Sequence, residues 1–417
     1  MGVTLGFTGT GGRGGTLLET CLEIDGVAVT AVCDAVPENR EDASDTVEAA
    51  GQPAPDRYDD HADLVARDDL DGVVVSTPWR FHIPMAVEAM EAGVHAAIEV
   101  GPANSVEECW ELVRTHEATG RQCMLLENHC FRRRMMAVLN MVRRGLFGEL
   151  VHCQGGYEHD LRGRIVTGKG TGIERAGGGD YRSLQNEKRC ADLYPTHGVG
   201  PVAKYLGVNR GNRFLKLTAT ASKAAGLEDW SDEHLDPDHP QADTDWANGD
   251  IVSTTIKCAG GETIVLSHDT TLPRPYSNNR RVQGTDGIWM ENGDSVYVEG
   301  RSPEHEWEEY EPYRDEYEHP LWERYREQGV VEGHGGSDYL GLSSFAAAID
   351  RGVTVPVDAY DAAAWMALAP LSEESIANGS QPVSVPDFTG GAWMDRGPIW
   401  GLYGDVPDGK LDSTAVL

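Results

Sequence analysis

A glycine-rich turn near the start of the sequence contains residues of the kind that hold phosphate groups. Gly9, Gly11 and Gly14 form a GxGxxG pattern between the apolar segment Val3–Thr8 and an apolar helical run over residues 16–24. Gly9 permits a tight turn, Gly11 lets the backbone approach a pyrophosphate, and Gly14 permits close packing of the helix on the strand. The free N–H groups at the start of that helix are suited to binding phosphates.

An acidic residue follows at the spacing that this pattern requires. Asp34 ends a second apolar segment, Val27–Cys33, and lies 20 residues beyond Gly14. Its carboxylate would accept hydrogen bonds from the adenosine ribose and repel a 2′-phosphate, which favours NAD over NADP. Glycine-rich turns often have no ligand, but the strand, helix and acid together predict a dinucleotide site.

The segments around these residues alternate between buried strands and helices. Strands are predicted at residues 72–76, 94–100 and 122–126, and helices at 83–92 and 105–119. This alternation is typical of an α/β, doubly wound parallel sheet, in which ligands bind at the carboxyl ends of the strands. Those ends are Asp34, Thr77–His82, Glu99-Val100 and Glu127-Asn128. For His82, a structural role in capping its helix is an equal alternative.

The sequence after residue 128 predicts a different kind of domain. Short alternating segments at residues 218–221, 251–258, 263–269, 281–284 and 295–298 indicate an open, mainly antiparallel sheet. We therefore predict a Rossmann domain over 1–128, an α+β substrate domain over 129–400 with the active cleft between the two, and a C-terminal tail over 401–417. Residues 228–245 are interpreted as a solvated loop. The aromatic residues of 304–327 either line a sugar cleft or pack on the sheet, and packing is favoured.

The composition excludes several partners. The 417 residues contain 35 Lys and Arg against 68 Asp and Glu, a net charge of −33, and 28 of the basic residues are Arg. Such a surface repels phosphate backbones, so we expect no nucleic acid, and no apolar run is long enough to span a membrane. Acid-rich, Lys-poor surfaces are typical of halophilic proteins; an ordinary acidic enzyme is the alternative.

The cysteines and the N-terminus favour a reducing compartment. The eight cysteines show no CxxC pair, and most lie in apolar segments. The sequence opens on a strand, without the basic and apolar regions of an export signal. We expect a cytoplasmic protein, and its open sheet offers a surface for homo-oligomerisation.

Two sets of motifs resemble known families. Thr77-Pro78, His82 and Glu99 resemble the Gfo/Idh/MocA oxidoreductases, although Glu99-Val100-Gly101-Pro102 lacks the lysine that this superfamily usually has there. A narrower resemblance, to glycoside hydrolase family 109, spans nearly the whole chain. It rests on Leu126–Asn128, Gly156–Arg162, Leu193–Pro201, Asn209–Phe214, Pro273–Ser277, His319–Trp322, Gly333–Gly336 and Pro370–Glu373. The founding activity of that family is an NAD-dependent α-N-acetylgalactosaminidase.

The resemblance implies roles for individual residues. It gives Tyr157 and His197 catalytic roles, and the near-neutral pKa of a histidine suits proton removal. For substrate it implies Arg182, Tyr194, Pro195, Thr196, His197 and Tyr276. For NAD it implies Gly9, Gly11, Gly12, Arg13, Gly14, Asp34, Trp79, Arg80, Phe81, His82, Glu99, Val100, Asn128 and Tyr194. The chain departs from the family at His129, Phe131 and Cys190–Asp192, which puts recognition of an acetamido group in doubt.

The implied chemistry differs from that of ordinary glycosidases, which place two carboxylates across the scissile bond. It consists of oxidation at C3, loss of the C2 proton, elimination of the aglycone, addition of water and reduction. A net sugar or polyol oxidoreductase and a regulator without turnover are the alternatives. His159, Asp160 and His334 match no metal-site spacing, so we expect no metal.

Overall fold

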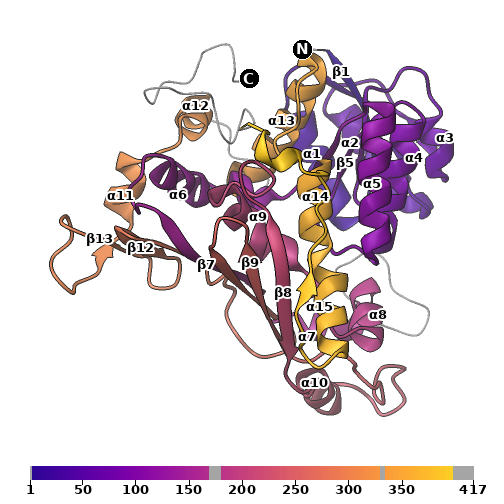
Figure 1. Cartoon of the computed structure of the whole chain (residues 1–417). Helices are drawn as coiled ribbons and strands as arrows, with labels where there is room; N and C mark the ends of the chain where they lie inside the picture. Colours follow the sequence, from indigo (N-terminus) through magenta and orange to yellow (C-terminus); the bar gives the residue numbers. More distant parts are fainter. Residues whose placement is uncertain (1, 169–179, 329–333, 398–417) are drawn as a thin grey trace. The chain divides into compact units, whose positions relative to one another are not determined.

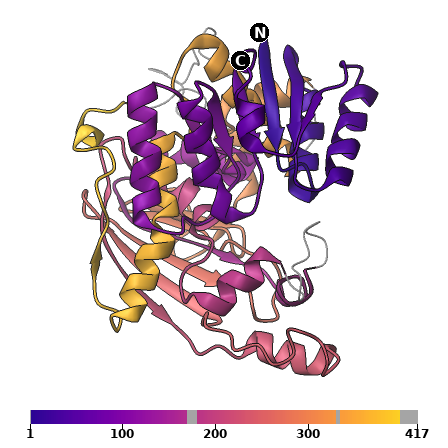
Figure 2. The ribbon, with the colours of Figure 1, turned by 90° about the vertical axis from the view of Figure 1, so that its right-hand side faces the viewer.

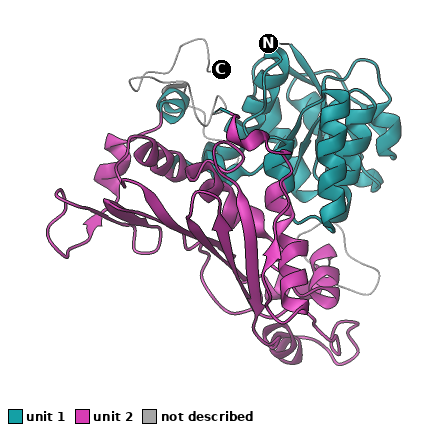
Figure 3. Cartoon of the chain, viewed as in Figure 1, with its two compact units in different colours: residues 1–133, 320–363, 397–417 teal, residues 134–319, 364–396 magenta. Residues whose placement is uncertain are grey.

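The structure is a computed structural model that describes residues 2–168, 180–328 and 334–397. Its described residues form two compact units, coloured separately in Figure 3. Unit 1 contains residues up to 133, residues 320–363 and residue 397, and unit 2 contains residues 134–319 and 364–396. The predicted tail over 401–417 lies outside the described residues.

Unit 1 is built on a six-stranded parallel sheet with the strand order β3-β2-β1-β4-β5-β6. Each neighbouring pair is parallel, and β4 is buried along its whole length, as expected of a strand covered on both faces. The strands are β1 (Val3–Thr8), β2 (Val27–Cys33), β3 (Asp56–Tyr58), β4 (Gly72–Val75), β5 (His95–Ile98) and β6 (Cys123–Leu125). The predicted doubly wound sheet is confirmed.

Helices connect these strands, and Figures 1 and 2 show them packed beside the sheet. They are α1 (Gly12–Leu22), α2 (Pro37–Ala49), α3 (His61–Val65), α4 (His82–Glu91) and α5 (Val106–Thr119), with 3₁₀ turns at Trp79–Phe81 and Asn128–Phe131. The limits of α5 follow from its sequence. The Ser105 hydroxyl caps the N–H of Glu108 at 3.2 Å, and Gly120, with φ of 68°, ends the helix in the left-handed conformation.

A segment from late in the chain also belongs to unit 1. It contains α12 (Pro320–Gln328), α13 (Ser337–Arg351) and the start of α14 (Ala359–Met366). Helix α13 packs on α1 and β1. The Trp322 indole N–H donates to the carbonyl of Phe131 at 2.8 Å, which ties α12 to the segment after β6.

Unit 2 is built on a nine-stranded sheet with the order β14-β13-β12-β11-β7-β10-β9-β8-β15. Strands β7 and β10 pair in parallel and the other neighbouring pairs are antiparallel, so the expected mainly antiparallel sheet is confirmed. The strands are β7 (Leu150–Glu158), β8 (Phe214–Ala221), β9 (Ile251–Cys258), β10 (Thr263–Asp269), β11 (Arg281–Gly284), β12 (Gly287–Met290), β13 (Ser295–Val298), β14 (Glu308–Glu309) and β15 (Val383–Ser384).

The helices of unit 2 are α6 (Arg133–Arg143), α7 (Arg162–Thr167), α8 (Tyr181–Lys188), α9 (Pro195–Tyr205), α10 (Gly226–His234), α11 (Glu311–Glu316) and α15 (Leu368–Ala377). Two of them, α9 and α15, pack directly against this sheet, and α7 packs on α8 and α10. Helix α9 lies on β7 and β10, and α15 lies along β8 (Figures 1 and 2).

Helix α10 corrects one expectation, because part of residues 228–245 is helical rather than a loop. Glu228 and Asp229 occupy its first turn and His234 its last, which suits the helix dipole, and Leu227 and Ser231 are buried.

Further expectations concern side chains. Tyr310, Tyr313, Trp322 and Tyr325 are buried whereas Trp307 is 54% exposed, so packing dominates in the acidic, aromatic stretch. The described residues include all eight cysteines, and none of them is in a disulfide. Among the described residues, we find no helix with the length and apolar character that crossing a membrane requires.

Candidate active site

The glycine-rich turn of unit 1 has the close packing that its sequence predicts. Gly9 has a φ of 84°, and a Cβ there would lie 2.8 Å from the backbone of Ser76. A Cβ on Gly14 would lie 1.7 Å from the carbonyl oxygen of Gly9, closer than two nonbonded atoms can approach. Only glycine fits at these two positions, and their packing brings the start of α1 directly onto the end of β1.

The start of α1 is suited to an anion. Gly11 is the N-cap, and no side chain caps the helix there. Asp34, at the end of β2, accepts hydrogen bonds from the backbone N–H groups of Thr10 at 2.8 Å and Gly11 at 3.3 Å. These observations fit a dinucleotide, because glycines leave room for a pyrophosphate, N–H groups are concentrated beside it, and a buried acid stands where a ribose would bind.

Arg13 lies within this turn and makes two ion pairs. Its Nε donates to Glu99 at 2.7 Å, and its Nη1 and Nη2 donate to Asp338 at 2.6 and 2.8 Å. Asp338 also accepts from Asn128 Nδ2 at 3.0 Å and lies 2.6 Å from His334 Nδ1. Burial alone would raise the pKa of Asp338, but Arg13 and His334 hold it well below its usual range. Two of the residues expected around NAD, Arg13 and Asn128, therefore contact the Asp338 carboxylate, and a third, Glu99, pairs with Arg13.

Of the expected cofactor residues after β4, Trp79 and His82 are buried, Phe81 is partly exposed and Arg80 is exposed. His82 is 1% exposed, its Nε2 lies 2.6 Å from the carbonyl of Thr77, and burial lowers its pKa. This bond gives the buried ring a structural partner, but it does not cap α4, because Thr77 lies before that helix. Trp79 is buried, and a Cβ on Gly101 would lie 2.5 Å from its indole. The Arg80 guanidinium lies over the Phe81 ring at 4.5 Å. The N–H of Val100 donates to the carboxylate of Glu99 at 3.0 Å.

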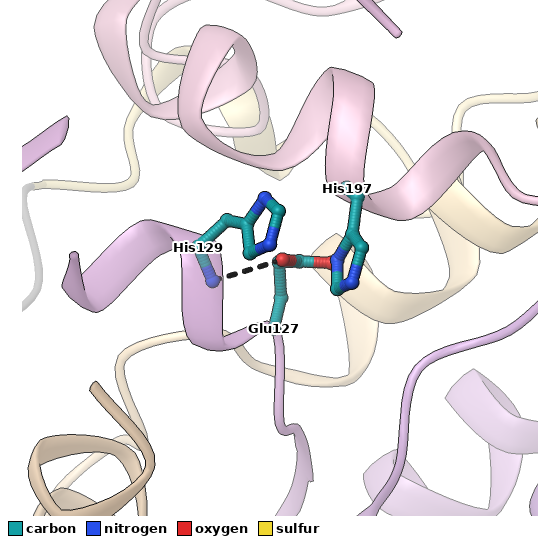
Figure 4. Close-up of side chains that lie close together, drawn as sticks. All are labelled: Glu127, His129 and His197. Carbon is teal, nitrogen blue, oxygen red and sulfur yellow. Dashed lines mark hydrogen bonds between the residues drawn. The ribbon is translucent and has the colours of Figure 1, made fainter. Parts of the chain in front are cut away.

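A buried acid, Glu127, follows β6. The sequence indicated this residue only by its position at the carboxyl end of a predicted strand. Glu127 is 0% exposed, and its carboxylate accepts the backbone N–H of His129 at 3.0 Å (Figure 4). The third residue drawn in Figure 4, His197, belongs to helix α9 of unit 2.

Unit 2 gathers the residues that were expected to act on substrate. The Tyr157 ring lies 4.5 Å from that of Tyr194 and 5.5 Å from that of His197, and the last two are 4.9 Å apart. Tyr276 lies 6.3 Å from Tyr157, again between ring centroids. Tyr157 comes from β7, while Tyr194, Pro195, Thr196 and His197 form the N-terminal end of α9. Whether Tyr194 also binds the cofactor stays a prediction.

Arg182 adds a buried cation to this cluster. Its guanidinium lies over the Tyr194 ring at 5.1 Å, and it is 8% exposed. Burial alone would lower the pKa of Arg182, but the neighbouring groups Tyr181, Tyr157 and Tyr194 raise it. The Asp180 carboxylate accepts the N–H of Arg182 at 2.7 Å and caps α8, which fixes the start of that helix.

The sequence did not single out His159 as a partner of Tyr157. Its Nδ1 lies 3.3 Å from the Tyr157 hydroxyl, and its ring packs edge-on against Tyr276 at 5.1 Å. Burial, followed by Arg182 and Arg164, lowers the pKa of His159, which favours a neutral imidazole able to accept the phenolic proton. Strand β7 ends at Glu158, but the N–H of His159 still donates to the carbonyl of Asp269 on β10 at 2.8 Å. The alternation of the strand therefore extends to His159 and places it on the same face as Tyr157.

The carboxylates beside the cluster are engaged by arginines. Arg274 forms ion pairs with both Glu158 and Asp269. Asp160 pairs with Arg162 at 2.9 Å. Phenols, imidazoles and a guanidinium therefore surround Tyr157, a set that suits transfer of protons to and from a polar substrate.

One departure from the expected family pattern lies just before α9. Asp192 is 3% exposed, its carboxylate accepts the N–H of Tyr194 at 3.3 Å, and burial raises its pKa to about 7.

Family models match both parts of the chain. Residues 131–395 match the model described as "Glycosyl hydrolase 109, C-terminal domain", which covers more than half of the sequence. The chain belongs to glycosyl hydrolase family 109. Residues 3–127 match the model of the oxidoreductase family with an NAD-binding Rossmann fold, so the cofactor of this family 109 protein is NAD.

Curated relatives cover nearly the whole chain. A glycosyl hydrolase family 109 protein of Stenotrophomonas maltophilia (strain K279a) is 46% identical over 96% of this chain and 92% of its own. An alpha-N-acetylgalactosaminidase of Tannerella forsythia is 43% identical over 95% of this chain and 88% of its own. Among solved structures, a levoglucosan dehydrogenase in complex with NADH and L-sorbose aligns with a TM-score of 0.66 at 21% identity, over 93% of this chain and 100% of the other. That likeness concerns the fold alone.

Proposed function

We propose that this family 109 protein is an NAD-dependent glycosidase that cleaves α-linked N-acetylgalactosaminides or closely related glycosides. The observation that carries the proposal is the cluster of Tyr157, His159, His197 and Arg182 in unit 2. It offers groups that transfer protons, while the neighbouring carboxylates Glu158 and Asp269 are paired with Arg274. The activity in the name of the Tannerella forsythia relative indicates the first substrate to test.

The residues of the chain divide the proton transfers between them. The glycine-rich turn and Asp34 would hold NAD, which would supply the acceptor, and later the donor, of the C3 hydride. We assign removal of the C3 hydroxyl proton to the His197 imidazole. We assign the C2 proton, which a ketone at C3 makes acidic, to Tyr157, whose hydroxyl lies against His159. Loss of that proton expels the C1 aglycone, and water then adds at C1 as a proton returns to C2.

The remaining residues hold the partners of the reaction. Arg182 and Tyr276 suit a sugar through hydrogen bonds and ring contact. The turn from Gly9 to Gly14, with Arg13, Asp34, Glu99 and Asn128, would hold NAD. Because of the departures at Cys190–Asp192, the proposal includes related glycosides without the acetamido group. A cytoplasmic location, salt adaptation and homo-oligomerisation through the open sheet also belong to this proposal.

Turnover in deuterated water tests the chemistry. We expect release of the aglycone from aryl N-acetyl-α-galactosaminides with deuterium incorporated at C2, as seen by NMR of the product. Thioglycosides should also be cleaved, because protonation of the leaving group is not central. Aglycone release without deuterium at C2 would exclude the mechanism, since direct displacement leaves C2 untouched. Stoichiometric accumulation of NADH without aglycone release would instead favour the net oxidoreductase.

Two variants locate the chemistry. His197→Ala and Tyr157→Phe should each lower the rate by about 10²–10⁴-fold if these side chains transfer protons. Tyr205→Phe is the matched control, because it removes a hydroxyl from the same helix as His197 that donates to the carbonyl of Met135 at 3.1 Å. It should stay within a few-fold of the parent. Nearly full activity of both variants would show that the active site lies elsewhere in the protein.

A further inference from the structure

Helix α9 contains a proline where the backbone of His197 needs a donor. In an α-helix each carbonyl accepts the N–H of the residue four positions later, which for His197 is Pro201. Pro201 has no N–H, and a proline ring also displaces the carbonyl four residues before it. Every residue of α9 is buried, so water cannot take the place of the missing donor. A buried carbonyl left without a donor destabilises the fold.

Arg280 supplies the missing hydrogen bond. Its Nη2 donates to the His197 carbonyl oxygen at 2.7 Å, from a side chain that is 0% exposed. Its Nη1 donates to Asn278 Oδ1 at 3.1 Å and pairs with Glu291 at 3.3 Å. A guanidinium presents its donors in a fixed fork, so one side chain can hold a helix carbonyl and a side chain outside the helix together.

Asn278 extends this connection to the other side of the cluster. Its Nδ2 donates to the carbonyl of Gly156 at 2.8 Å, directly before Tyr157. Its Oδ1 also accepts from the Tyr276 hydroxyl at 3.0 Å. A continuous series of hydrogen bonds therefore runs from His197 to the backbone next to Tyr157.

Close packing of glycines fixes the same two elements against each other. A Cβ on Gly155 of β7 would lie 2.3 Å from the carbonyl of Gly198 on α9. A Cβ on Gly198 would lie 3.0 Å from the Cα of Gly156. The helix thus meets the strand backbone beside both His197 and Tyr157, where small shifts of α9 would change the distance between these side chains.

We infer that Arg280 is a positioning residue that replaces the helix hydrogen bond removed by Pro201 and thereby sets His197 against Tyr157. A backbone N–H at residue 201 would satisfy the same carbonyl but would tie it only to its own helix. The proline leaves that carbonyl open to Arg280, which ties it to Asn278 and the sheet. The expected effect on kcat rests on the proposed glycosidase function. The effect of Arg280 on the position of His197 does not depend on it.

A double-mutant cycle tests the coupling. Arg280→Met should lower kcat by at least about tenfold with little change in KM, because it displaces His197 without removing a group that contacts sugar. Pro201→Ala should stay within a few-fold of the parent. In the double variant the N–H of the new alanine satisfies the carbonyl but does not restore the tie to Asn278, so only part of the lost kcat should return. Independent effects of the two substitutions on kcat would overturn the inference.

A second measurement does not depend on the substrate. With ¹³C-labelled histidine, the ring resonance of His197, assigned by its loss in His197→Gln, should move in Arg280→Met and return toward the parent when Pro201→Ala is added. Arg280→Lys keeps the positive charge but loses the two-donor geometry of the guanidinium, so it should also move the His197 resonance. This variant gives the same test if Arg280→Met does not fold. Arg281→Met, the neighbouring residue on β11, is the control and should leave the resonance in place.

The two readouts separate the two proposals. A His197 resonance that does not respond to Arg280 would overturn the positioning role, whatever the protein hydrolyses. A resonance that responds as expected, in a protein that releases no aglycone from any glycoside, would uphold the positioning role and contradict the proposed function. Retained NAD should accompany Arg280→Lys, since the dinucleotide residues belong to unit 1.

Discussion

Arg13 and Asp338 form a two-point ion pair, with distances of 2.6 and 2.8 Å, although 325 residues separate them in the sequence. The Asp338 side chain is 1% exposed and that of Arg13 is 28% exposed. A fork of this kind fixes the direction of the guanidinium as well as its distance. The carboxylate on α13 therefore sets the position of a side chain in the glycine-rich turn.

Asp338→Asn should weaken both folding and NAD binding. Removing one partner of a buried pair costs about 3 kcal/mol, and the released Arg13 should lower NAD affinity by about tenfold. Denaturant melts and NAD titrations of the variant measure the two effects. Asp350→Asn, at the exposed end of the same helix, is the control and should change neither.

The pH dependence of that loss follows from the lowered pKa of Asp338. A carboxyl group with a depressed pKa in the folded state stabilises the fold above its unfolded pKa of about 3.9, and this contribution falls as the pH drops below that value. The difference in unfolding free energy between parent and variant should therefore be constant near neutral pH and shrink below about pH 4. If the difference in unfolding free energy between parent and variant stayed constant well below pH 4, it would contradict the ion pair.

Gly14→Ala should disrupt the glycine-rich turn, because its methyl group would lie 1.7 Å from the Gly9 carbonyl oxygen. We expect destabilisation of about 1–3 kcal/mol or more and loss of NAD binding. Gly15→Ala is the matched control on the same helix, since its nearest contact is 3.3 Å. Equal NAD affinity of the two variants, measured by titration, would show that the close approach at Gly14 has no role.

Asp34 should make the site prefer NAD, and Asp34→Asn should reduce that preference about tenfold by removing the charge that repels a 2′-phosphate. Asparagine keeps an oxygen that can accept from Thr10 and Gly11, so the turn should persist. Titration of NAD and NADP into protein stripped of cofactor measures the ratio, with the exposed Asp59→Asn as the control. Tighter binding of NADP by the parent would refute the assignment.

Asp192 should make the fold less stable as the pH rises through neutrality. Because burial raises its pKa to about 7, the folded state binds a proton that the unfolded state loses above about pH 3.9, so stability falls between these values. Asp192→Asn should remove this loss and add about 2–4 kcal/mol of stability at pH 8. Melts of both proteins at pH 5 and pH 8 measure it; a gain of equal size at both values would be inconsistent with this titration.

Salt should stabilise the protein, because a net charge of −33 creates self-repulsion that added ions screen. We expect the melting temperature to rise steadily up to molar KCl or NaCl. Thermal melts across a salt series measure this. A melting temperature that is flat, or that falls with salt, would refute the prediction of salt adaptation.

The local pattern of the sequence predicted the parallel sheet of unit 1 and its glycine-rich turn. The glycines at 9, 11 and 14, the strand endings and Asp34 are close in sequence and act through backbone geometry, which residue type controls directly. The pattern missed β7, because Gly155 and Gly156 interrupt the alternation that marks a strand. Those same glycines are the ones that admit α9.

Only the tertiary structure decided which distant residues share a site. Nothing in the spacing shows that α13 supplies Asp338 to the glycine-rich turn, or that Arg280 satisfies the carbonyl left open by Pro201. His159 was visible in the sequence, but its role beside Tyr157 depended on β7 being a strand. Hydrogen bonds and ion pairs between remote segments depend on how strands order themselves in a sheet and how helices pack on it. The order of the strands and the packing of the helices depend on all the core residues together. The local periodicity of the sequence therefore does not predict them.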